Sequence, residues 1–245
     1  MKKFILTLFI ISSFKTIAQI ASDSLSEAPS NTFDFGIDFQ SRYIWRGLQL
    51  GGNSPSAQPY IELSSGKFAI GAWGAYNLGG LSIGNEVDLY VTYSISDAFS
   101  LTITDYFFPT DGNSQDYFPY NKGHVFEAMI SFAGTHSFPI GLSVATNFGG
   151  AIKYDDSGHE KSAYSTYVEA NYSKIVNEIE YSLFAGAVFR DNNNYYLTDG
   201  FGLINLGISV AKEIKLSDSF SLPIKAALTL NPDAENIYLT FGFSL

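Results

Sequence analysis

The sequence predicts an all-β protein, a transmembrane up-and-down antiparallel β-barrel of about 12 strands. Three observations support this prediction. The chain ends in an amphipathic strand, most of the preceding sequence alternates with the period of a strand, and the connections between the strands alternate between long and short.

The C-terminal stretch 236–245 reads NIYLTFGFSL. Side chains of a strand alternate between two faces, so one face of this stretch is wholly apolar. An aromatic-rich strand that reaches the last residue resembles the terminal assembly signal of bacterial outer-membrane barrels. We assign that signal to Leu239, Phe241, Phe243 and Leu245. The last strand of a soluble sandwich is the alternative, because such a face can also cover a core.

Strand-like alternation continues through the rest of the chain. Twelve segments show it, and an even number is typical of bacterial single-chain barrels. The predicted strands are 33–45, 57–64, 67–77, 85–95, 98–108, 123–133, 140–149, 162–173, 177–189, 202–212, 219–230 and 236–245.

The connections are sorted by length. Those after odd-numbered strands are mostly long, with 231–235 the short member, and those after even-numbered strands are mostly tight. Such sorting is typical of an up-and-down membrane barrel with periplasmic turns and extracellular loops, whereas a Greek-key sandwich gives no reason for it. We therefore expect the polar stretches 111–116 and 191–194 to lie outside the cell and to accept insertions.

The N-terminal residues predict export. Residues 1–18 read as a signal peptide, with Lys2 and Lys3 before an apolar run and a small-residue site before Gln19. The run is too short for a membrane anchor helix, which needs about 20 residues. We divide the chain into this signal peptide, a periplasmic segment 19–32 and an outer-membrane barrel 33–245.

Composition narrows the possible functions. The chain of 245 residues contains no cysteine, which removes disulfides and thiol chemistry. Its net charge of -10 has the same sign as a phosphate backbone, so we expect no nucleic-acid partner.

The charged residues fall mainly on the face opposite the large apolar side chains, where they would line a lumen. Eight acidic residues against four basic ones favour cations, although the charges could also pair across a filled interior. The predicted lumen-lining residues are Asp34, Asp38, Arg42, Arg46, Glu62, Glu86, Asp88, Glu127, Glu169, Glu180, Arg190 and Lys225.

Aromatic residues gather towards the ends of several predicted strands. In a membrane barrel such residues form a girdle at the lipid interface, whereas a soluble protein would bury the rings. The predicted girdle comprises Tyr43, Trp45, Trp73, Tyr76, Tyr106, Phe107 and Phe108. Asp105 shares the phase of apolar neighbours, and we expect it near the outer interface.

No catalytic or metal-binding pattern emerges. The three histidines are His124, His136 and His159. His124 and Glu127 point to opposite faces of one strand, and His136 lies in a short turn. His159 follows Asp155 in a polar loop, which could bind a cation but reads more simply as a flexible loop. We expect no catalytic residue, no metal and no cofactor.

Four blocks in the first half carry a family resemblance: SRYIWRGL at 41–48, QPYIE at 58–62, GAW at 71–73 and NEVDLY at 85–90. They resemble the TorF family of porin-like outer-membrane proteins, most closely over 33–108. The resemblance implies a porin-like role and supplies no catalytic residues.

The leading hypothesis is a passive channel for small polar or cationic solutes in the outer membrane of a Gram-negative bacterium. A structural or adhesive barrel that acts through its extracellular loops is the second, and a barrel enzyme the third. The expected partners are outer-membrane lipid, the barrel-assembly machinery and a small polar solute.

Overall fold

The computed structural model describes residues 31–80, 84–109 and 117–245. The predicted signal peptide, most of segment 19–32 and the stretch 111–116 lie outside these residues. No helix among the described residues is long and apolar enough to cross a membrane.

Twelve antiparallel strands close into one barrel, which confirms the predicted fold class and strand count. Each wall strand corresponds to one predicted segment, and chain neighbours pair in sequence order. The wall strands are β1 (Thr32–Gln40), β4 (Ser56–Ser65), β5 (Phe68–Asn77), β6 (Glu86–Ser94), β7 (Phe99–Phe107), β8 (His124–Phe132), β9 (Gly141–Gly149), β12 (Thr166–Val176), β13 (Ile179–Arg190), β14 (Gly202–Lys215), β15 (Ser221–Asn231) and β16 (Asn236–Ser244).

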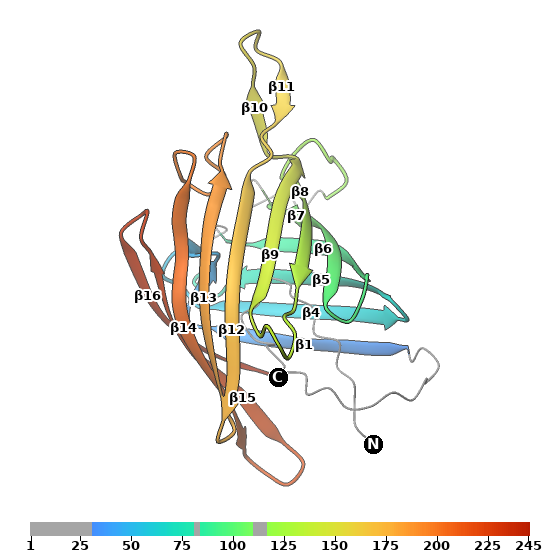
Figure 1. Ribbon diagram of the computed structural model, residues 1–245, viewed down its shortest axis with the longest axis vertical. Helices are drawn as coiled ribbons and strands as arrows, with labels where there is room; N and C mark the ends of the chain where they lie inside the picture. Colours follow the sequence, from blue (N-terminus) through green and yellow to red (C-terminus); the bar gives the residue numbers. More distant parts are fainter. Residues whose placement is uncertain (1–30, 81–83, 110–116) are drawn as a thin grey trace.

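Two short hairpins interrupt this meander. The pair β10 (Ile152–Tyr154) and β11 (Glu160–Ser162) stands beyond one end of the barrel, opposite the end that carries the tight β12–β13 and β14–β15 turns (Figure 1). The other pair, β2 (Tyr43–Trp45) and β3 (Leu48–Leu50), follows β1. The single strand predicted at 33–45 is therefore two strands, β1 and β2, because the chain leaves the barrel wall after Gln40.

The barrel is apolar outside and polar inside. On β6, Leu89 and Val91 are exposed, while Tyr90 between them and Asp88 and Thr92 on either side are buried. Apolar side chains in contact with lipid and polar ones in the interior are the arrangement of a membrane barrel. A soluble sandwich would place the same side chains the other way round.

The seam between the first and last strands is short. All nine residues of β1 pair with β4, whereas only Asp38–Gln40 pair with β16. Hydrogen bonds of 3.0 Å in both directions between Ile37 and Leu245 extend the seam at one end. The N-terminal half of β16 has no β1 neighbour, so the wall has a gap where the chain turns inward.

Candidate functional site

The β2–β3 hairpin turns into the interior of the barrel. Trp45 and Leu48 face each other across a two-residue turn formed by Arg46 and Gly47, whose φ angles are 47° and 78°. Positive φ at both central residues is the geometry of a type I′ turn, which suits the twist of a hairpin. Arg46 adopts this conformation at a cost of about 1–2 kcal/mol, which other contacts must offset.

The hairpin touches the wall on several sides. The Tyr43 hydroxyl donates a hydrogen bond of 2.8 Å to Glu86 on β6. At the tip, Asn231 on β15 donates through Nδ2 to the carbonyl of Gly47 at 3.1 Å. A Cβ on Gly47 would lie 1.7 Å from the carbonyl oxygen of Ile204 on β14, so only glycine fits. The hairpin therefore crosses the lumen and constricts it.

Arg46 anchors the tip of the hairpin. Its guanidinium donates to both carboxylate oxygens of Glu127 at 2.5 and 2.8 Å, and to the hydroxyl of Tyr196 at 2.6 Å. The same group lies 4.7 Å from the ring centroids of both Trp45 and Tyr167. A bidentate charged pair between aromatic faces is among the strongest polar anchors in proteins. It holds the hairpin against β8 and β12.

A folded loop, 191–200, lies beside the hairpin. The Asp191 carboxylate accepts hydrogen bonds of 2.8 Å from the backbone N–H groups of Tyr195 and Tyr196. This positions the Tyr196 ring against Trp45, with 5.6 Å between the ring centroids and 10° between the ring planes. The stretch 191–194 is thus hydrogen-bonded to its surroundings, and whether it accepts insertions stays a prediction.

Two carboxyl groups are enclosed beneath the hairpin. Glu86 is 3% exposed and Asp88 is 0% exposed. With both groups ionised, neither oxygen of Asp88 has a hydrogen-bond donor among the described residues, and the indole N–H groups of Trp45 and Trp73 have no acceptor there. Such groups require ordered water or a shared proton. Both acids lie on the inward face of β6, as their strand phase predicts, but the hairpin covers them and they are not exposed to an open lumen.

The structure sorts the other predicted lumen residues into three groups. Asp38 and Lys225 are buried inside with Glu127, and Glu62, Glu169 and Glu180 are half-buried on the same inward face. Asp34 is exposed on that face, near the start of β1. Two basic residues do not line the lumen: Arg42 lines a groove at the seam, and Arg190 is exposed opposite Thr166 after a register shift.

The predicted aromatic girdle is largely wrong. Tyr43 and Trp45 are carried inward by the hairpin, and Trp73, Tyr106 and Phe108 point inward by strand phase; these five belong to the buried interior cluster or pack against it. Phe107 has the outward phase of Ile103 but is covered by Tyr117 and His124. The buried or partly buried residues are Tyr43, Trp45, Trp73, Tyr106, Phe107 and Phe108. Of the seven, Tyr76, which is 52% exposed, and Phe107 keep the outward phase expected of girdle residues.

The three histidines lie apart, with His124 on β8, His136 between β8 and β9, and His159 between β10 and β11. His124 Nδ1 lies 2.8 Å from Asp105, and its other ring nitrogen lies 2.7 Å from the Tyr117 carbonyl. Asp155 is held by Lys161 at 2.9 Å, and that contact, followed by backbone N–H groups, lowers the pKa of Asp155. The described residues contain no group of three potential metal ligands.

Comparisons with known proteins agree with the barrel. The solved structure of the NanC porin superposes with a TM-score of 0.51 at 9% identity, covering 86% of this chain and 98% of that one. A weaker likeness, with a TM-score of 0.32 at 10% identity, is to Wzi of Escherichia coli, described as an outer-membrane carbohydrate-binding β-barrel in group 1 capsule assembly. It covers 79% of this chain and 52% of that one. No curated protein sequence matches.

At 9% identity the NanC structure establishes the fold alone. A family model described as a bacterial protein of unknown function, Gcw_chp, matches residues 25–222. This range covers all the wall strands up to the start of β15 and includes the inward hairpin. The chain therefore belongs to the Gcw_chp family.

Proposed function

We propose that this protein is an outer-membrane channel for the passive diffusion of small polar or cationic solutes, with the β2–β3 hairpin as its constriction. The observation that carries the proposal is a closed barrel whose apolar surface faces outward and whose interior holds charged residues around one folded-in hairpin. Membrane barrels with polar interiors commonly serve as channels that inward loops narrow.

The charge of the interior supports a preference for cations. Arg46 and Glu127 neutralise each other. Of the twelve predicted residues, Arg42 and Arg190 do not line the lumen either. Without these two and the Arg46–Glu127 pair, seven acidic residues and one basic residue, Lys225, remain inside. The acids include Asp34 and Glu62 towards the end where β1 begins. An excess of negative charge along a narrow polar path raises the local concentration of cations.

A second candidate function is a barrel that transports nothing and acts through its external surface. Contacts of the hairpin with β6, β8, β14 and β15 favour it, because they close much of the lumen at one level. The projecting β10–β11 hairpin would then carry the contact surface, with Tyr154 63% exposed.

Recordings in planar bilayers separate these candidates. We would compare the native chain with a variant in which residues 43–50 are replaced by a short Gly-Ser turn. The channel proposal expects small, cation-selective conductance from the native chain and larger conductance from the variant. Conductance in the variant alone would mean that the native barrel is closed, and conductance in neither, from folded protein, would support the second candidate.

Three further assignments belong to the same proposal. The TorF resemblance fits a porin-like role for a chain of this family. Leu239, Phe241 and Phe243 face outward on β16 and Leu245 is exposed directly after it, as residues read by the barrel-assembly machinery would be. Export by a signal peptide would deliver the chain to the outer membrane of a Gram-negative bacterium.

A further inference from the structure

A groove opens on the outside of the barrel at the seam between β1 and β16. Its volume is about 530 Å³, within the range of roughly 300–1,000 Å³ typical of small-molecule sites. The groove exists because β1 ends at Gln40, so the part of β16 before Phe241 is paired with β15 on one side but has no strand on the other. Ser41 forms its inner corner, where its N–H donates to the Phe241 carbonyl at 2.8 Å and its hydroxyl accepts from the Phe241 N–H at 3.1 Å.

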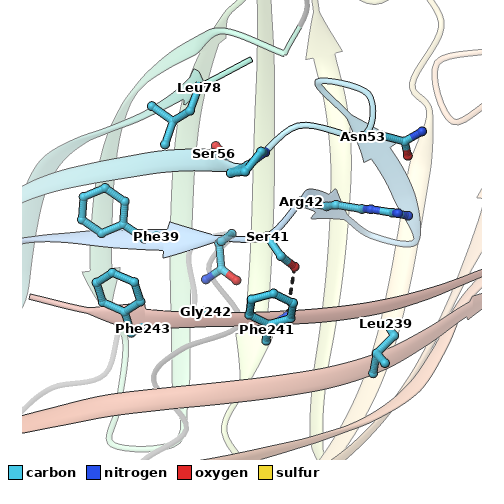
Figure 2. Close-up of a pocket in the computed structure, with 12 residues that line it drawn as sticks. Phe39, Ser41, Arg42, Asn53, Ser56, Leu78, Leu239, Phe241, Gly242 and Phe243 are labelled. Carbon is cyan, nitrogen blue, oxygen red and sulfur yellow. Dashed lines mark hydrogen bonds between the residues drawn. The ribbon is translucent and has the colours of Figure 1, made fainter.

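The two ends of the groove differ in chemistry. Phe39 and Phe243 stack at one end, with 5.1 Å between their ring centroids, and Arg42 and Asn53 lie at the other (Figure 2). Leu78, Leu239 and Phe241 form apolar edges, and these three side chains are 55%, 69% and 68% exposed. The groove therefore offers an apolar track that leads to a cation and an amide.

Arg42 is the unusual member of this set. Among the described residues no carboxylate lies within ion-pair distance of it, and Tyr238 on β16 is the neighbour that its charge acts on. Its neighbours in the groove are mostly apolar, and the chain as a whole is strongly acidic. A cation at the level of a lipid-facing wall is costly unless an anion or water accompanies it.

We propose that this groove binds one anionic, phosphate-bearing amphiphile of the surrounding membrane. Its chain lies along Leu239, Phe241 and the Phe39–Phe243 stack, and its phosphate accepts hydrogen bonds from Arg42 and Asn53. The groove continues the apolar outer surface of the barrel, so a membrane lipid reaches it by lateral diffusion. This proposal requires the barrel to lie in a membrane and does not depend on conduction.

The test is native mass spectrometry of the full-length mature barrel released from nanodiscs. The discs contain either phosphatidylglycerol, an anionic lipid, or phosphatidylcholine, a zwitterionic one. We expect one phosphatidylglycerol molecule to remain on the native barrel and phosphatidylcholine to be lost. Arg42→Gln should lower retention of phosphatidylglycerol about tenfold, because charged hydrogen bonds to the phosphate are lost. Arg42→Lys should keep most of it.

Arg190→Gln is the matched control, since it removes an exposed arginine outside the groove and should leave retention unchanged. Heat-modifiable gel mobility verifies that each variant is folded. Equal retention of the two lipids by the native barrel, or undiminished retention by folded Arg42→Gln, would overturn the proposal. Displacement of the retained lipid by inorganic phosphate at a concentration equal to that of the lipid would also overturn it, because the apolar track would then add nothing to the affinity.

Discussion

The anchor of the hairpin gives the sharpest prediction. Replacing Arg46 with Ala removes two hydrogen bonds to Glu127 and one to Tyr196. It also leaves the Glu127 side chain, which is 1% exposed, as a buried charge without its partner. Breaking a buried pair in this way costs about 3–5 kcal/mol. The equilibrium between docked and undocked hairpin should shift by roughly 150-fold or more.

The two tryptophans of the chain report on this change directly. Trp45 lies on the hairpin and is stacked on Tyr196, and the Trp73 ring is 5.6 Å from that of Tyr43. Undocking should move the emission of Arg46→Ala to longer wavelength, raise conductance and lower the urea midpoint of the folded barrel. A control, Arg190→Ala, should change none of these.

A double-mutant cycle separates the ion pair from other effects of the substitution. Glu127→Gln alone leaves Arg46 without its carboxylate, and the combination with Arg46→Ala should cost much less than the sum of the single changes. Additive effects, or an Arg46→Ala spectrum identical to that of the native chain, would refute the view that this pair holds the hairpin.

Three other predictions follow from the wall and its loops. Gly47→Ala should undock the hairpin and shift the tryptophan emission, because the new Cβ would lie 1.7 Å from a carbonyl oxygen. The control Gly52→Ala, also at positive φ but in open space, should keep native tryptophan emission. Equal emission shifts in the two variants would contradict the steric argument. Leu239→Arg places a charge in hydrocarbon and should cost about 2–4 kcal/mol on folding into lipid vesicles, while the inward Thr240→Arg should cost clearly less. Trypsin added to intact cells should cleave after Lys161 in the projecting hairpin, and cleavage only after permeabilisation would show the inverse topology.

The wall was predictable from the sequence because each strand has two chemically different faces. A segment such as 85–95 alternates apolar and polar residues, and only one register satisfies lipid outside and a polar interior. The tight turns then fixed which strands are neighbours. Strand ends were less certain, as in 162–173, where β12 begins four residues later at Thr166.

The interior hairpin was not predicted because its residues read as a continuation of the first strand. YIW before the turn and LQL after it have the same apolar character as the wall, and only the intervening Arg46-Gly47 signals a two-residue turn. The inward positions of Trp73 and Tyr106 could have been found from strand phase. Assigning them to a girdle relied on their nearness to the strand ends instead.

The docking contacts of the hairpin also impose an order on folding. Arg46 meets Glu127 across 81 residues of chain and Tyr196 across 150, and Gly47 meets Asn231 across 184. Closing such long loops is entropically costly, so these contacts form only after the strands that supply them are in place. An unoccupied interior must therefore exist during assembly, and the hairpin enters it as a late step. Substitutions at the tip should consequently leave the rate of strand insertion unchanged and alter only the slowest phase, in which the tryptophans become enclosed.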